Sequence, residues 1–419
     1  MIVRGVGAVQ RLRERRAPAA APESRPAGSP ALEIFAWSRL AIWAALVFAY
    51  LWFEPKPAPL AVLWDSEWVH DVGWLVDVWA RWDSAWFLRI AEDGYGSDPE
   101  RTPAFFPLYP VLVAGLGRVL GGHFLLAGVA ISMAATAAAF VLLFRLAEER
   151  LGADGARRAV LYLAVFPVSL FLGAVYSESL FLLLALASFL LAERGRWLAA
   201  GGVAGLALLT RAFGLALLPA LVLLAWRSPE RRRALASLAV APAALALYPL
   251  TLWQQVGDPW AFTDAQDTWN RRLTWLGPLQ GLWDGARAAW AGVRQIVAGP
   301  DGRTYWPIPD AEPMHTAIVN LSAFLFLLAF AFLTVVAWRR FGAPYGLFAA
   351  LGLLLPLSVP SERWPLLSLP RFGLVLFPLF LALAALGGGR PRLHGVVVAV
   401  SALFLGVAVV QWATWQWVA

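Results

Sequence analysis

Asp83 is the residue of this chain whose type and surroundings point most directly to chemistry. It lies in a polar, tryptophan-rich stretch, Arg81-Trp-Asp-Ser-Ala-Trp-Phe-Leu-Arg-Ile-Ala-Glu-Asp-Gly-Tyr95, followed by Ala104-Phe-Phe-Pro-Leu-Tyr-Pro110, in a chain that is otherwise mostly apolar. A carboxylate at a membrane surface is costly to place, which makes it a functional-site candidate. A base at that depth could meet both a lipid-borne and a water-borne reactant and take a proton from a hydroxyl group. In the alternative interpretation, Asp83 caps the start of a helix or pairs with Arg89.

The tryptophans around Asp83 predict an interfacial helix. Apolar residues recur there at steps of three or four, as on one stripe of a helix; they are Trp68, Val72, Leu75, Trp79, Trp82 and Trp86. Tryptophan is typical of the membrane–water interface, and the stretch is too polar to span. Asp83 lies about 100° around such a helix from Trp82, so we expect its carboxylate to face neighbouring protein.

Arginines and a glutamate elsewhere in the chain could complete such a site. Arg211 and Arg371 lie at predicted ends of membrane helices, where an arginine is either functional or extends its charge to the interface. Arg271 follows Trp269 in a long polar segment, where it could contact a substrate or lie on a solvated face. Glu178 begins a predicted helix, whose dipole favours a carboxylate there; alternatively, it orients an arginine or positions a substrate.

The composition is that of a membrane protein. The chain has 419 residues, of which 60% are hydrophobic and 15% charged. Apolar runs of about 20 residues, the length of one membrane crossing, recur along it, and the short alternating strands of a transmembrane barrel do not appear. We therefore expect an all-α polytopic membrane protein. The absence of cysteine excludes disulfides, and the four scattered histidines do not indicate a metal site.

About eleven membrane spans are predicted. They fall at about 34–53, 124–146, 158–174, 176–192, 197–211, 213–227, 234–254, 316–338, 343–358, 371–387 and 395–413. The stretch 105–120 is apolar but short and interrupted by prolines, so we expect an interfacial helix there. With a cytoplasmic N-terminus, the short inside loops are rich in arginine, as the positive-inside rule requires. The net charge of +7 follows this distribution and does not indicate nucleic acid as a partner.

This count divides the chain into a tail, a membrane domain and two large external loops. We expect residues 1–33 to be a disordered, Arg-rich cytoplasmic tail and residues 34–413 to form the transmembrane domain. The external loops are 54–123, which holds the interfacial helices, and 255–315. The Ala-, Arg- and Leu-rich, Lys-poor composition is typical of a bacterial gene of high GC content. The predicted location is therefore a bacterial plasma membrane, with the site on its external face.

The stretch around Asp83 resembles the first-loop signature of the PIG-V mannosyltransferase family, which belongs to the GT-C class of glycosyltransferases. Later pieces are similar to the family in the same order: Tyr176-Ser-Glu-Ser-Leu-Phe181, Thr210-Arg-Ala-Phe-Gly214, Gly257-Asp-Pro-Trp-Ala-Phe262, Ala265-Gln-Asp-Thr-Trp269 and Leu369-Pro-Arg-Phe372. The resemblance implies a GT-C-type transmembrane helix bundle. It also implies that a sugar, mannose in the family, moves from polyprenyl phosphate to a glycolipid or envelope glycan, and that Asp83 takes the acceptor proton. We expect the transfer to be inverting.

The same resemblance assigns roles to further residues. A lipid phosphate needs cationic donors, which arginine provides in a planar fork, and the candidates are Arg211, Arg371 and Arg271. The donor or acceptor would be positioned by Glu178, Arg89, Tyr95, Tyr109 and Trp269, of which the aromatic residues could instead belong to an interfacial belt. Because arginine alone can stabilise this leaving group and no Asp-x-Asp pair occurs, we expect no obligatory cofactor or metal, and a divalent ion stays open.

Two other classes of function stay open. A membrane transporter or a flippase of lipid-linked sugars would also have many spans and buried arginines. Transporters, however, tend to have inverted repeats and broken helices at mid-membrane, whereas polar residues here gather in the external loops. A structural subunit of an envelope assembly machine would have no need of Asp83.

Overall fold

Helices make up most of the described chain. The structure, a computed structural model, describes residues 29–55, 64–307, 312–361 and 364–418. Within these ranges no strand forms, and the extended pairing is limited to an isolated antiparallel bridge between Arg271 and Ser361. The predicted all-α class is therefore confirmed. Most of the predicted tail lies outside the described residues, whereas residues 29–33 already belong to the first helix.

Five helical segments of the described chain are long and apolar enough to cross a membrane. They are α1 Ser29–Trp52, α6 Phe124–Ala164, the run of α10 Arg231–Leu238, α11 Val240–Leu245 and α12 Leu247–Val256, then α15 Pro313–Phe341 and α19 Pro391–Ala413. Shorter helices hold most of the other predicted spans: α7 Glu178–Glu193, α8 Trp197–Leu208, α9 Gly214–Trp226, α16 Ala343–Ser358 and α18 Phe377–Gly387. The chain is thus a membrane protein with several crossing helices, but the predicted count of eleven is not confirmed.

Helix α6 covers both spans predicted at 124–146 and 158–174, but its second part ends at Ala164. It consists of two helical stretches that meet at Gly152, where the backbone leaves helical geometry. Gly152 adopts a φ of 70°, a conformation that glycine reaches without steric cost. The helix ends because Pro167 follows: proline disfavours helical geometry in the residue before it and has no N–H to donate.

Arg39 of α1 supplies hydrogen bonds where α6 ends. The last carbonyl groups of a helix lack partners within that helix. The Arg39 guanidinium donates to the carbonyl of Ala164 at 3.1 Å and to the carbonyl of Ser169, in the 3₁₀ turn η5 Ser169–Leu172, at 2.7 Å. Arg39 is only 4% exposed. It therefore joins α1 to the irregular, buried backbone that follows α6.

A helix break places Arg371 inside the protein. We predicted one span at 371–387, but α17 Leu369–Leu374 is separated from α18 by a short interruption. Pro378 cannot donate the hydrogen bond that a continuous helix would direct to the Leu374 carbonyl, although it is tolerated in the first turn of α18. Arg371 consequently lies on a short separate helix and is 9% exposed.

The segment predicted as the second external loop, 255–315, is largely helical. It holds α13 Ala261–Thr268 and α14 Pro278–Ala298. Helix α14 lies close to α15, because a Cβ atom at Gly292 would be only 2.7 Å from the carbonyl oxygen of Ala317. Small residues allow helix backbones to approach in this way.

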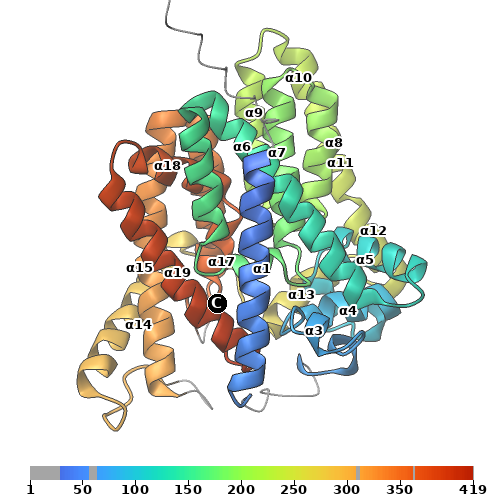
Figure 1. The fold of residues 1–419 in the computed structure, drawn as a ribbon. Coiled ribbons are helices and arrows are strands. Elements are labelled where there is room, and N and C mark those ends of the chain that lie inside the picture. Colours follow the sequence, from blue (N-terminus) through green and yellow to red (C-terminus); the bar gives the residue numbers. More distant parts are fainter. Residues whose placement is uncertain (1–28, 56–63, 308–311, 362–363, 419) are drawn as a thin grey trace, which may run out of the picture.

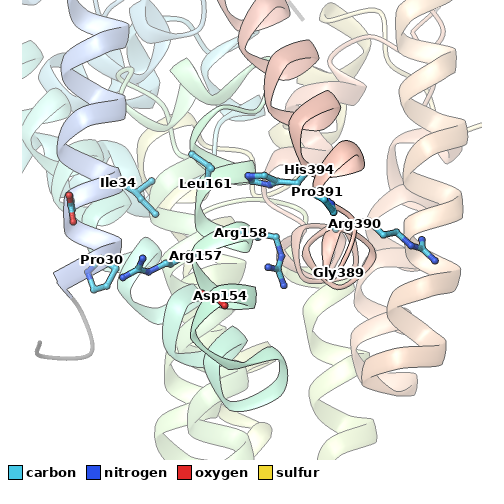
Figure 2. A pocket seen from close by; sticks show the side chains of 12 residues that line it. Pro30, Ile34, Asp154, Arg157, Arg158, Leu161, Gly389, Arg390, Pro391 and His394 are labelled. Atoms are coloured by element: carbon cyan, nitrogen blue, oxygen red, sulfur yellow. The ribbon is translucent and has the colours of Figure 1, made fainter. Parts of the chain in front are cut away.

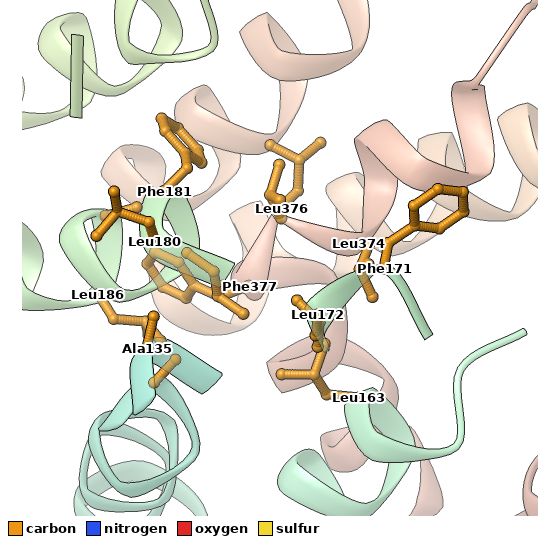
Figure 3. Packing of buried hydrophobic residues seen from close by; sticks show 14 of the residues in the cluster. Ala135, Leu163, Phe171, Leu172, Leu180, Phe181, Leu186, Leu374, Leu376 and Phe377 are labelled. Atoms are coloured by element: carbon orange, nitrogen blue, oxygen red, sulfur yellow. The ribbon is translucent and has the colours of Figure 1, made fainter. Parts of the chain in front are cut away.

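The apolar core lies where α6, α7 and α18 meet. Figure 3 shows Leu163 of α6, Phe181 of α7 and Phe377 of α18 in this cluster, and all three are fully buried. In Figure 1, the short helices α3 Trp74–Asp77 and α4 Ser84–Asp93 lie with α13 at the lower end of the bundle. Helix α10, which begins with three consecutive arginines, lies at the upper end.

Replacing Arg39 by glutamine should destabilise the protein. Glutamine is too short to reach both carbonyl groups, and a buried carbonyl without a partner costs about 1–3 kcal/mol. The measurement is the unfolding temperature of the purified protein in detergent, which should fall by several degrees. Arg118→Gln, which changes an exposed arginine at the end of α5 Leu108–Val119, is the matched control. Equal unfolding temperatures for the two variants would contradict the role given to Arg39.

Candidate functional site

Asp83 and Arg371 form a short and largely buried ion pair. Arg371 Nη1 lies 2.7 Å from Asp83 Oδ2, and the two side chains are 10% and 15% exposed. The Asp83 side chain makes no capping hydrogen bond, although it precedes the first residue of α4. Arg89 is not its partner either, because Arg89 pairs with Asp98 at 3.4 Å. The structure thus joins Asp83 to an arginine 288 residues further along the chain.

Glu178 links the two arginines of the site. Its Oε1 atom lies 2.7 Å from Arg211 Nη1 and 3.3 Å from Arg371 Nε, and the side chain is fully buried. Arg211 also donates to the Ser177 hydroxyl at 3.0 Å. Among the described residues neither Glu178 oxygen accepts an aligned hydrogen bond, so the arginines hold this carboxylate by charge. The location in the first turn of α7 adds the favourable helix dipole, and both interpretations of Glu178 therefore fit its position.

Arg271 brings a third guanidinium group to this region. It donates to the Leu367 carbonyl at 3.2 Å and lies 5.4 Å from the centre of the Phe372 ring. Burial, together with repulsion from nearby Arg371, lowers the pKa of Arg271 to about 10, so it remains a cation at neutral pH.

These five residues form what we call the charged cluster: Asp83, Glu178, Arg211, Arg271 and Arg371. Three guanidinium groups against two carboxylates leave an excess of positive charge. Burial strengthens the attraction of such an excess for an anion, and guanidinium groups match the geometry of phosphate oxygens. The cluster is thus suited to a phosphate group that arrives beside a carboxylate.

Each member of the charged cluster lies at a helix end or a helix break. Asp83 precedes α4, Glu178 begins α7, Arg211 lies between α8 and α9, Arg271 follows α13, and Arg371 belongs to the isolated α17. Side chains at such positions can turn into the space between helices rather than toward lipid. The breaks in the helices therefore serve to bring charge together inside an apolar bundle.

The backbone before Asp83 is held in an unusual conformation. Trp82 has a φ of 54°, which is rare for a bulky residue and costs about 1–3 kcal/mol. The Tyr176 hydroxyl accepts a hydrogen bond from the Asp83 N–H at 3.0 Å and donates to the Arg81 carbonyl at 3.1 Å. Tyr176 is 1% exposed, so the surrounding packing fixes the position of the hydroxyl group that makes both hydrogen bonds. Sequence reasoning quoted Tyr176 within a motif but did not single it out.

The single interfacial helix predicted from the tryptophan stripe is wrong. The stretch is divided into a 3₁₀ turn at Glu67–Val69, α3 and α4, with irregular backbone between them. Positive φ angles at Gly73 and Trp82 interrupt any continuous helix. Trp82 and Trp86 are 5% and 1% exposed, so they lie within the protein and not on a lipid-facing surface.

A group of tryptophans from the C-terminal part of the described chain covers the Asp83 loop, and sequence reasoning missed it. The Trp82 ring lies 5.3 Å from Trp417 and 5.8 Å from Trp415. The Trp412 indole donates to the Val78 carbonyl at 2.8 Å. The signal in the sequence was the recurrence of tryptophan at the end of the last apolar run, which an interfacial belt of aromatic residues explains equally well.

The other predicted positioning residues make their hydrogen bonds, ion pairs and ring contacts with residues outside the charged cluster. Arg89 forms the ion pair described above. The buried Tyr95 and Tyr109 hydroxyls donate to the carbonyls of Phe105 and Gly128 at 2.7 and 3.0 Å. Trp269 packs its ring 5.6 Å from that of Trp86, in the aromatic wall next to Asp83. Of the four, Trp269 is therefore placed best to touch a ligand at the site.

The chemical groups around Asp83 are cationic and aromatic. Among the described residues no three side chains of His, Asp or Glu gather in a way that could hold a metal ion. Asp83 and Glu178 each face arginine, so the arrangement offers donors for an anion.

Comparison with known proteins adds an independent finding. Residues 64–226 match the family model of the mannosyltransferase (PIG-V) family. The matched segment includes Asp83, Glu178 and Arg211, and it ends before Arg271 and Arg371. No curated protein matches the chain.

Among solved structures, the chain is similar to the oligosaccharyltransferase of Archaeoglobus fulgidus. The apo form has 16% sequence identity and a TM-score of 0.42, with 90% of this chain and 56% of that chain covered. The same enzyme in complex with an inhibitory peptide and a dolichol-phosphate has 15% identity and a TM-score of 0.40, with the same shares covered. This chain therefore spans little more than half the length of these proteins.

The family match covers the segment that supplies the candidate base and two of its charged neighbours. The resemblance seen in the sequence is thus confirmed over that segment. Residues 64–226 of this chain are thus similar to the PIG-V mannosyltransferase family.

Proposed function

We propose that this chain is an inverting mannosyltransferase. It transfers a sugar from a polyprenyl-phosphate donor to a hydroxyl group of a glycolipid or an envelope glycan, with Asp83 as the base. The observation that carries this proposal is the ion pair of Asp83 with Arg371, because it joins a carboxylate that could accept a proton to a guanidinium group that could move to a donor phosphate. The PIG-V match over the Asp83 segment supports the same chemistry.

The reaction requires a base and a site for the leaving group on opposite sides of the sugar. The acceptor oxygen attacks the anomeric carbon, its proton passes to the Asp83 carboxylate, and the bond between that carbon and the phosphate oxygen breaks. The electron pair leaves with polyprenyl phosphate, and the configuration at the anomeric carbon inverts. Positioned bases contribute about a hundredfold to ten-thousandfold to such steps.

The arginines hold the donor phosphate and also release the base. In the structure, Arg371 engages the Asp83 oxygen that would accept the proton. An incoming phosphate competes for the same guanidinium group, because charge-assisted bonds to phosphate are strong. When Arg371 turns to the phosphate, Asp83 becomes available to the acceptor. Arg211 and Arg271 then stabilise the negative charge that develops on the phosphate of the leaving group.

The aromatic wall contacts the sugar. Trp269 is partly exposed and packs against the buried Trp86 with the two rings at a right angle, so Trp269 can offer an apolar face to a pyranose ring. The buried Tyr95 and Tyr109 position this wall from behind through hydrogen bonds to backbone carbonyls. Arg89 stabilises the same loop through Asp98.

The site faces the outside of a bacterial plasma membrane. The arginines of α10 are at the end of the bundle opposite to α4 and α13 (Figure 1). Loops rich in arginine remain in the cytoplasm, which supports an N-terminus inside and Asp83 outside. The bundle is of the GT-C type, and the reaction has no obligatory cofactor or metal.

Asp83→Asn should abolish most of the transfer with little change in shape. Loss of the base should lower the rate about a hundredfold or more. Release of polyprenyl phosphate from polyprenyl-phosphate mannose, measured with purified protein in vesicles and a glycolipid acceptor, gives the rate. Asp267→Asn is the control, because it breaks an aspartate–arginine pair of 3.1 Å that is exposed. Full transfer by a folded Asp83→Asn protein would refute the assignment of Asp83 as the base.

Arg371→Lys should weaken donor binding and transfer together. Lysine keeps the charge but cannot contact Asp83 and Glu178 at once with a planar fork. Loss of a hydrogen bond between charged groups, worth about 1.5–3 kcal/mol, should raise the KM for the donor about tenfold or more. Arg272→Lys, at an exposed ion pair with Asp267, is the matched control. A KM equal in both variants, with equal unfolding temperatures, would exclude Arg371 from donor binding.

The vesicle measurement also separates the enzyme from a transporter or flippase. A transporter would move polyprenyl-phosphate mannose between leaflets without releasing polyprenyl phosphate. A structural subunit would show neither effect, and its role would survive Asp83→Asn.

A further inference from the structure

A cavity lined by charged and apolar side chains lies far from Asp83, at the arginine-rich end of the bundle. It has a volume of about 620 Å³ and lies between the start of α1, the second half of α6, and the turn from α18 to α19. Figure 2 shows Pro30 and Ile34 on one side, Arg157, Arg158 and Leu161 along α6, and His394 and Pro391 on the other. Its volume is in the range of sites that bind small molecules or cofactors.

Arg158 is the centre of this cavity. Its Nε atom donates to the Ala384 carbonyl at 3.2 Å, which anchors the side chain and leaves the terminal nitrogens toward the cavity. It is half-buried, yet in the described part of the chain no carboxylate lies within 4 Å of it. Its terminal nitrogens are therefore available to an anion in the cavity. Arg157, an exposed residue on the same helix that forms no ion pair with the described residues, adds a second positive group.

The frame around Arg158 is rigid and built to leave space. The Tyr162 hydroxyl contacts His394 Nδ1 at 3.0 Å and ties α6 to α19. Position 387 requires glycine, because the Cβ atom of any other residue would lie 2.5 Å from the Tyr162 hydroxyl oxygen. The opening is therefore part of the packing of α6, α18 and α19, and not a gap between surface side chains.

The charges of the cavity select an anion with a single negative charge. Glu33 and Asp154 also line it and form no ion pair with its arginines. Arg390 lines it too, but its guanidinium group points away from the other arginines (Figure 2). The carboxylates would repel a group with two or more negative charges, such as a nucleoside diphosphate. A phosphodiester has one charge and two oxygens that a guanidinium fork can hold.

The position of the cavity indicates where such a phosphodiester comes from. The cavity opens at the starts of α1 and α19 and beside the bend of α6 at Gly152, and these three helices are long enough to cross a membrane. Helix ends of that kind lie at the depth of lipid headgroups, and basic pockets between membrane helices bind them. Ile34, Leu161 and the two prolines offer apolar contact to the glycerol part of a lipid.

We propose that this cavity is a binding site for the phosphodiester headgroup of a phospholipid, with Arg158 and Arg157 as the phosphate ligands. The site is separate from the transferase site and belongs to the opposite leaflet. A lipid bound there braces the turn between α18 and α19.

The test uses the full-length protein and phospholipid added after removal of native lipid. Phosphatidylglycerol should remain bound in native mass spectrometry and should raise the unfolding temperature. The double variant Arg157→Gln with Arg158→Gln should bind it at least about tenfold more weakly. The control is Arg231→Gln with Arg232→Gln, which removes two exposed arginines from α10 at the same end.

Each outcome decides the proposal independently of sugar transfer. Retention of lipid by the control and its loss from the cavity variant would support the site. Equal binding by both variants would overturn it. Inorganic phosphate or a nucleoside diphosphate that raises the unfolding temperature as much as the lipid would overturn the assignment to a lipid, because the ligand would then be a soluble anion.

Discussion

The buried ionic contacts among Asp83, Glu178, Arg211 and Arg371 are the constraint on which the rest of the structure depends. Charges withdrawn from water are stable only when their partners are present, and removal of one partner leaves the others uncompensated. Glu178 is fully buried and has two arginines, so the segments that supply them must meet in one place. The fold is therefore required to bring α7, the turn after α8, and α17 together at the loop before α4.

This requirement explains why the bundle contains so many short helices. A continuous membrane helix points its side chains toward neighbouring helices or lipid, and it cannot end where a charge is needed. The break at Pro378 and the end of α6 before Pro167 provide such ends within the apolar core. Tyr176, in the irregular segment between α6 and α7, then fixes the backbone on both sides of Trp82. The helix breaks are therefore what allows the charged side chains to meet inside the bundle.

Sequence reasoning found the charged residues but not their pairing. Asp83 stands out in a polar, tryptophan-rich stretch, and Glu178, Arg211 and Arg371 lie near predicted helix ends, where a charge in an apolar chain needs a reason. The contact of Asp83 with Arg371 could not be inferred, because nothing local connects positions 288 apart. The helical class was readable from the length and composition of the apolar runs. The break between α17 and α18 was also readable, since Pro378 lies inside the predicted span.

The tryptophans show a different limit. Steps of three or four in the sequence predicted one helix, but Gly73 and Trp82 take backbone angles that no helix contains. Periodicity records where apolar side chains recur and not whether the backbone between them is continuous. The contact of Trp412 with Val78 is likewise tertiary. Such a contact depends on how α19 is oriented, which its own sequence does not specify.

The double attachment of Glu178 has a consequence for the sequence of events at the site. An anion that draws Arg371 away does not leave this inner carboxylate bare, because Arg211 stays 2.7 Å from it. Glu178 therefore keeps an ion-pair partner throughout. The site can exchange the contact between Arg371 and a carboxylate for a contact between Arg371 and a bound anion without leaving an isolated charge in the apolar interior. With a single arginine, binding of an anion would leave the buried carboxylate without a cationic partner.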